Sequence, residues 1–158
     1  MKRHRPTPRL EQLVNGWTER AYLEGDEGYW ADTVLRACGF LEDRGLRLDE
    51  ILFHRDGNAI TYQSRDLAVL FEYAPDAEPV YLEAAIGVRG RTRDGLMPVD
   101  HLLVANDPAI VFPTRPALTR AAVRANIWFC ADGIRRLMDR QGGVLGSPAS
   151  SSSRERDS

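Results

Sequence analysis

Residues 47–88 read RLDEILFHRDGNAITYQSRDLAVLFEYAPDAEPVYLEAAIGV, and this stretch decides the fold. Apolar residues in it recur at every second position, most clearly at Leu67, Val69, Phe71 and Tyr73. A period of two is typical of a β-strand with one buried face. We therefore predict a four-stranded antiparallel meander, whose strands cover residues 47–54, 59–63, 67–74 and 80–88.

Turn-forming residues separate these strands. Asp56-Gly57 is a pair that favours a type I′ hairpin turn. The run Pro75-Asp-Ala-Glu-Pro79 predicts the turn between the last two strands. A symmetric turn there places Glu72 and Glu83 on facing strands, on the outer face of the sheet. Two carboxylates directly opposite each other repel, so we expect an arginine between them or a cation from a partner.

Segments of helical period flank the strands. A first helix is expected from Pro8, with apolar residues at Leu10, Leu13, Val14, Trp17 and Ala21. A second is expected from Asp26, which can cap it, to Gly45, which can terminate it. Residues 97–105 alternate in the manner of a fifth strand. A long helix is expected from about Pro116 to Gln141, with an apolar stripe of Val123, Ile127, Cys130, Ile134, Leu137 and Met138.

Strands grouped between helices predict an α+β fold. We expect two N-terminal helices, a four- to five-stranded antiparallel sheet and a long C-terminal helix packed on it. Residues 9–143 then form a single domain. Residues 1–8 are expected to be a flexible basic arm, and the Ser-rich tail 144–158 is expected to be disordered.

Composition narrows the function classes. The chain has 158 residues, 43% of them hydrophobic, which suits a globular protein. Its net charge of −2 argues against general nucleic-acid binding. We found neither a membrane-spanning run nor a secretory signal, so a cytoplasmic location is expected. The histidines and the two cysteines lack catalytic or metal-ligand spacing, so we expect no metal, no cofactor and buried free thiols.

Charge is unevenly distributed along the chain. Residues 11–50 hold ten acidic residues against four arginines, whereas residues 115–140 hold six arginines against two aspartates. The acidic part carries aromatic side chains and would suit a basic protein partner; a plain solvated helix surface is the alternative. The candidate partner-binding residues there are Glu24, Asp26, Glu27, Tyr29 and Asp32.

A second candidate cluster lies on the C-terminal helix. Trp128 falls off the apolar stripe, between Arg124 and Arg135. Tryptophan and arginine are enriched at interaction hot spots. The alternative is that the N-terminal helices cover Trp128 while the arginines extend to the rim.

Two other function classes remain open. Asp100 and His101 could serve an enzyme or ligand-binding domain with a pocket between the sheet and the last helix. The glycine-rich segment 87–95 carries Arg89, Arg91 and Arg93, which could contact an anion or RNA. That segment matches neither the Walker nor the Rossmann spacing, so a solvated loop is the simpler interpretation.

The stretch from Trp30 to Gly87 includes CGFLEDRGLRL and then FHRDGNAITYQSRDLAVLFEYAPDAEPVYLEAAIG. This order of segments resembles small bacterial immunity proteins of polymorphic toxin systems, many of them actinobacterial. The resemblance implies a non-enzymatic protein that sequesters a cognate toxin and blocks its active site. It implies no specific contact residues, because these families share no fixed contact motif. It leaves the oligomeric state and the identity of the partner open.

Overall fold

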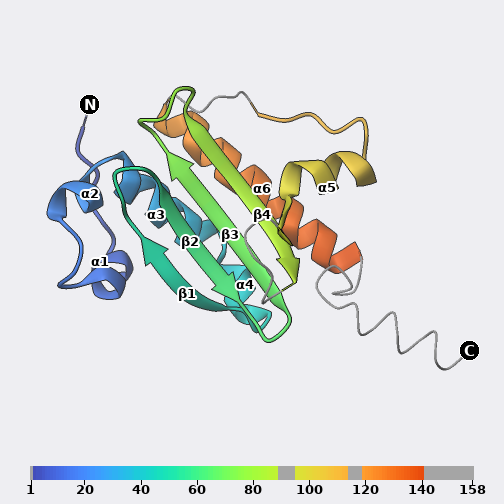
Figure 1. The fold of residues 1–158 in the computed structure, drawn as a ribbon, viewed down its shortest axis with the longest axis horizontal. Helices are drawn as coiled ribbons and strands as arrows, with labels where there is room; N and C mark the ends of the chain where they lie inside the picture. The colour runs from blue at the N-terminus through green and yellow to red at the C-terminus, as the bar shows by residue number, and fades with distance from the viewer. Residues whose placement is uncertain (1, 89–94, 114–118, 141–158) are drawn as a thin grey trace, which may run out of the picture.

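The computed structural model describes residues 2–88, 95–113 and 119–140, and it confirms the α+β class (Figure 1). Four helices precede the strands: α1 Pro8–Val14, α2 Arg20–Glu24, α3 Asp26–Ala37 and α4 Gly39–Asp43. The strands are β1 Arg47–Leu52, β2 Asn58–Gln63, β3 Leu67–Ala74, β4 Tyr81–Val88 and β5 Met97–Pro98. Helices α5 Val99–Asn106 and α6 Arg120–Arg140 follow.

The sheet has five strands in the order β1-β2-β3-β4-β5, and every neighbouring pair is antiparallel. Buried and half-buried residues alternate along the whole of β2 and β3, as the period of two predicts. Val69 and Phe71 of β3 point into the core, whereas Leu70 and Glu72 point to the opposite face.

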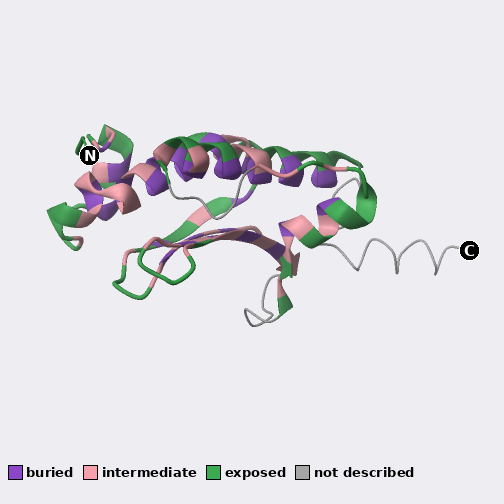
Figure 2. Ribbon diagram, turned by 90° about the horizontal axis from the view of Figure 1, so that it is seen from above, coloured by how far each residue is buried: buried purple, intermediate pink, exposed green. Residues whose placement is uncertain are grey.

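Helices α3 and α6 cover one face of the sheet and pack against each other (Figures 1 and 2). Among the described residues, no helix lies on the other face (Figure 2). Trp30 of α3 is fully buried and its ring stacks on Tyr73 of β3, with centroids 5.6 Å apart. The whole apolar stripe predicted for the last helix is buried: Val123, Ile127, Cys130, Ile134, Leu137 and Met138. The sheet therefore has one core face and one outer face.

The expected first helix is divided into α1 and α2. Gly16 follows the C-cap Asn15 with a φ of +87°, a left-handed conformation that ends helices and favours glycine. The expected second helix is likewise divided, into α3 and α4, at Cys38. Gly45 terminates α4 with a φ of +89°, as predicted.

The turn between β1 and β2 differs from the type I′ prediction. The Gly57 N–H donates to the carbonyl of His54, so Arg55 and Asp56 are the central residues of this turn. A type I′ turn needs a positive φ at both central residues, and no described non-glycine residue has one.

The fifth strand predicted over 97–105 is wrong beyond its first two residues. Helix α5 begins at Val99, and the buried side chains of Val99 and Leu103 are one helical turn apart. Leu103 packs so closely on α6 that a Cβ on Gly133 would lie 2.7 Å from its Cδ1.

Thr119 caps α6 by accepting from the Ala122 N–H at 3.1 Å, while Pro116 and Gln141 lie outside the described residues.

Candidate protein-binding surface

The acidic residues at the α2–α3 junction are paired within the chain. Glu24 lies 3.2 Å from the Arg20 guanidinium and 3.7 Å from that of Arg3. Asp26 accepts a hydrogen bond from Nε of Arg120 at 2.9 Å. These contacts neutralise carboxylates that the sequence offered as partner-binding residues, and Asp26 joins the N-terminus of α3 to the N-terminus of α6.

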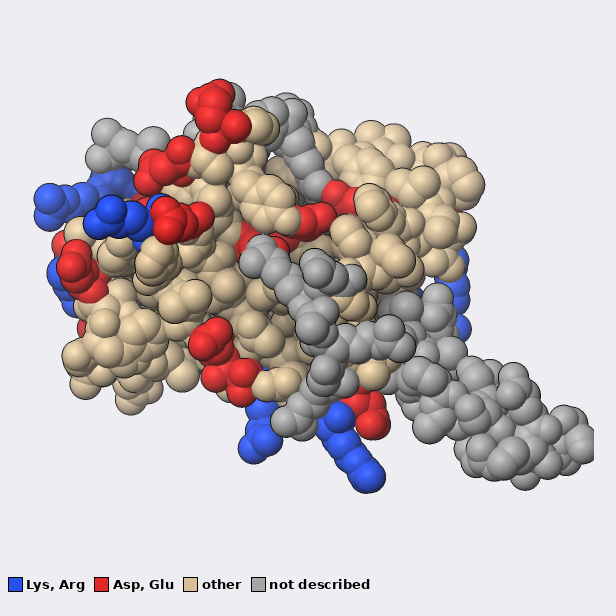
Figure 3. All heavy atoms as spheres, in the orientation of Figure 1, with Lys and Arg blue, Asp and Glu red and all other residues tan. Residues whose placement is uncertain are grey.

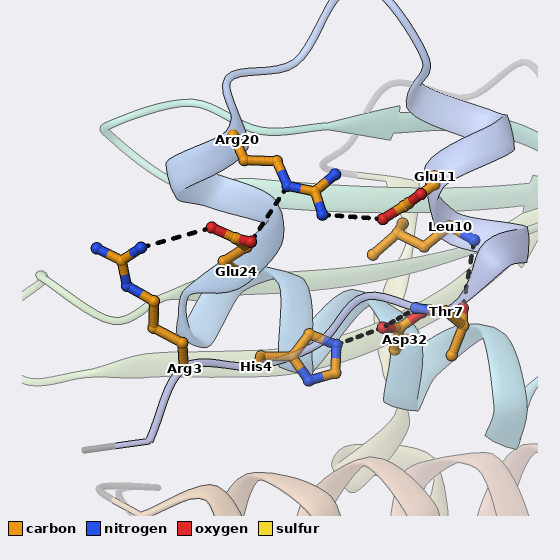
Figure 4. Close-up of polar contacts among 8 residues, drawn as sticks. All are labelled: Arg3, His4, Thr7, Leu10, Glu11, Arg20, Glu24 and Asp32. Carbon is orange, nitrogen blue, oxygen red and sulfur yellow. Dashed lines mark hydrogen bonds and ion pairs between the residues drawn. The ribbon is translucent and has the colours of Figure 1, made fainter.

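Asp32 is a core residue, which corrects its placement on an exposed acidic surface. Its side chain accepts from the Thr7 N–H at 3.1 Å and from the Thr7 hydroxyl at 2.5 Å, and it also contacts Nε2 of His4 (Figure 4). Only 5% of Asp32 is exposed. The arm residues that we expected to be mobile therefore lie against α3, and the His4 N–H bonds to the carbonyl of Glu24. Asp32 anchors this segment and is not available to a partner.

Glu27 and Tyr29 are also partly enclosed. Burial raises the pKa of the Glu27 carboxyl, and the nearby carboxylates of Asp76 and Asp26 raise it further. The Tyr29 ring meets the His4 ring edge-on at 5.6 Å and lies under the Arg120 guanidinium at 5.3 Å. The predicted acidic surface is thus largely occupied by intramolecular contacts.

The cluster around Trp128 is brought together only in part. The Arg124 guanidinium lies 5.7 Å from the Trp128 ring centroid, but that of Arg135 lies over Phe40 instead, at 4.5 Å. Trp128 is half-buried against the core, and its indole nitrogen is buried with no hydrogen-bond partner. Only Arg124 therefore borders the tryptophan, and the predicted cluster of Trp128 between two arginines is not formed.

The outer face of the sheet holds the remaining candidates. Glu72 and Glu83 are direct partners in the β3–β4 register, as the turn at 75–79 predicted. The Tyr81 hydroxyl donates to the Glu83 carboxylate. Burial and this bond raise the pKa of Tyr81 to about 12. On the face seen in Figure 3, carboxylates lie among mostly uncharged side chains, while Lys and Arg gather toward the rim.

A hollow of about 250 Å³ opens on this face beside the β1–β2 turn. Its lining includes Leu52, His54, Glu72 and Tyr81. Buried Asn58 supports one wall, because its side chain accepts from the His54 N–H at 3.3 Å and donates to the Tyr73 carbonyl at 2.9 Å. Apolar, aromatic and acidic groups therefore meet in one concave region, which can receive a side chain that is cationic at its tip and apolar along its stem.

The alternative site around His101 is not assembled among the described residues. His101 is exposed on α5, and the space between sheet and α6 is filled by core residues such as Val99 and Ile134. Arg89, Arg91 and Arg93 lie outside the described residues. In the part of the chain that is described, no three His, Cys, Asp or Glu side chains are grouped to hold a metal ion. No helix there is both long and apolar enough to span a bilayer.

Sequence reasoning missed two surface residues beside β1. Trp17 was placed on the apolar stripe of the expected first helix, and Leu52 fell inside the expected strand 47–54; both are exposed in the structure. Asn15-Gly16 before Trp17 was the available signal, because such a pair ends a helix and turns the next side chain away from its apolar face.

Comparison with protein-family models, curated proteins and solved structures gave no significant match to this chain.

Proposed function

We propose that this chain is a non-enzymatic protein-binding domain whose outer sheet face binds and occludes a basic partner, in the manner of an immunity protein that blocks a toxin. The observation that carries the proposal is the outer sheet face itself. It is not covered by any described helix, and it combines apolar side chains with the opposed carboxylates of Glu72 and Glu83 (Figures 2 and 3).

The composition of this face suits association with a protein. Leu52 and Tyr81 are exposed, at 43% and 40%, and Leu70 lies half-buried at the centre of the face. Apolar area of this kind supplies affinity, while the negative charge steers a basic surface toward it. A stable complex of ordinary size buries about 800 Å² on each partner, so the sheet with its rim is a suitable platform.

The competing acidic surface is less suitable. Binding through Glu24 and Asp26 would compete with their existing ion pairs to Arg20 and Arg120. Asp32 would have to leave the core. On the outer face the Glu83 carboxylate already accepts from the Tyr81 hydroxyl, but the strands themselves need no rearrangement, because the core holds them on their other side.

The test is to isolate the partner with the tagged native chain and then to express the two proteins together, scored by growth. The native chain should protect the cells. Glu83→Arg should abolish protection, because it reverses charge at the centre of the proposed contact. Asp132→Arg, an exposed change on α6, should leave protection intact, and circular dichroism should show both variants folded. Absence of protection by the native chain, or full protection by Glu83→Arg, would contradict the proposal.

A further inference from the structure

Strand β1 borders the sheet, and its outer edge faces a groove of about 420 Å³. One wall is formed by Leu13 of α1 and by Trp17, and the other is formed by residues 48–52 of β1. No described strand pairs with this edge. An edge strand presents a row of main-chain N–H and C=O groups that an extended segment of another protein can bond.

The groove is rich in exposed apolar surface. Leu13, Trp17 and Leu52 line it, with exposures of 39%, 54% and 43%. Gly16, in its left-handed conformation, and the bond from the Trp17 N–H to the Val14 carbonyl set the position of Trp17. A large aromatic side chain held by a fixed turn beside an open strand edge is a suitable anchor for a peptide side chain.

The acidic side chains of β1 determine which kind of strand can pair with its free edge. Asp49 and Glu50 occupy the middle of β1, and both are exposed. The strand also carries an irregularity between Leu48 and Glu50, where Asp49 is the additional residue. Acidic side chains and a bulge at an edge oppose uncontrolled pairing. The acids also leave the edge complementary to a strand that carries lysine or arginine.

A second copy of the chain meets that requirement poorly, because its β1 carries one basic residue, Arg47, against Asp49 and Glu50. When two β1 strands pair antiparallel over their full length, the twofold axis lies at the middle of the strand, between Asp49 and Glu50. Asp49 and Glu50 of the two copies would then face each other, and like charges directly opposite destabilise a strand pair.

We propose that the β1 groove binds an extended, basic segment of the partner, which adds to the sheet as a strand beside β1. The proposal rests on the proposed function, since it specifies how the partner engages this domain. The groove and the outer-face hollow are neighbours, because Leu52 lines both. A partner seated on the outer face can therefore extend one strand over the edge.

The test uses the whole chain labelled with ¹⁵N and two capped synthetic heptapeptides of alternating polarity. One peptide carries Lys and Arg between valines, and the other carries Glu at the same two positions. At about 1 mM, the basic peptide should shift the amides of residues 48–52 and the indole signal of Trp17. Trp17→Ala should weaken this binding about tenfold. The double variant Asp49→Lys/Glu50→Lys should reverse the preference, so that it binds the acidic peptide.

Shifts that map away from β1, equal binding of both peptides, or no binding by either would overturn the proposal. A free chain that dimerises through β1 would overturn it as well. Leu70→Arg on the outer face should leave the peptide shifts unchanged. Because the proposed function is tested separately, with the complete partner and Glu83→Arg, failure of the groove and failure of the outer face give distinguishable results.

Discussion

Replacing Asp32 by alanine tests the assignment of this residue to the core. Asp32 is contacted by three groups of the N-terminal segment: the Thr7 N–H, the Thr7 hydroxyl and the His4 imidazole (Figure 4). Asp32→Ala removes the acceptor of all three. If Asp32 were the surface contact that the sequence suggested, the same change would have little effect on folding.

The expected loss of stability follows from these contacts. A hydrogen bond to a charged group contributes about 1.5–3 kcal/mol. His4 and Thr7 are only half-buried, so in the variant water can hydrate their polar groups and compensate for part of the lost hydrogen bonds. We therefore expect the free energy of unfolding to fall by about 3 kcal/mol. At about 2–4 °C per kcal/mol for a domain of this size, Tm should fall by about 6–12 °C.

The assay is thermal and urea unfolding followed by circular dichroism. The matched control is Asp132→Ala, which removes a helical carboxylate from an exposed ion pair with Arg136. That change should cost less than about 1 kcal/mol. The reasoning is refuted if the Asp32 and Asp132 variants lose similar, small amounts of stability.

Three further predictions follow from other parts of the structure. Glu27→Gln should raise Tm at pH 7 and lose that advantage at about pH 4, where glutamate protonates. Burial raises the folded pKa of Glu27, so the native carboxyl contributes stability at low pH that is lost as pH rises through that pKa. Gly28→Ala should destabilise the chain by about 1–3 kcal/mol in urea unfolding, because a Cβ there would lie 1.8 Å from the Leu23 carbonyl oxygen; an unchanged midpoint would contradict the close packing of α2 on α3. Cys38 should resist iodoacetamide at pH 8 until the chain is unfolded, because burial raises its thiol pKa, and rapid labelling of the native chain would contradict this.

The parts of the fold that local patterns determine were predictable. The period of two in β2 and β3 needs only neighbouring residues, and so does the apolar stripe of α6. The pairing of Glu72 with Glu83 followed from a single short turn. Residues 97–105 were ambiguous, because their apolar run fits both the period of two of a strand and the 3.6-residue period of a helix. In the structure most of this segment is helix α5, in which Leu103 packs against Gly133 of α6.

The partners and the burial of the acidic residues in the N-terminal helices could not be predicted from local sequence. Asp26 pairs with Arg120, which lies 94 positions away in the chain. Asp32 is buried by residues 25 and 28 positions before it, in a segment whose composition indicated a mobile arm. Whether a carboxylate faces solvent or an internal cation is decided by tertiary packing. The outer-face carboxylates kept their predicted placement because a hairpin fixes it.

The central claim is that the outer sheet face, and not the acidic helix surface, contacts the partner. The most direct test is calorimetric titration of the partner isolated with the tagged native chain into two variants, Leu70→Arg and Glu24→Arg, beside the native chain. Leu70→Arg should weaken binding about thirtyfold or more, whereas Glu24→Arg should stay within about threefold of the native Kd. Native affinity in Leu70→Arg together with a large loss in Glu24→Arg would contradict the account.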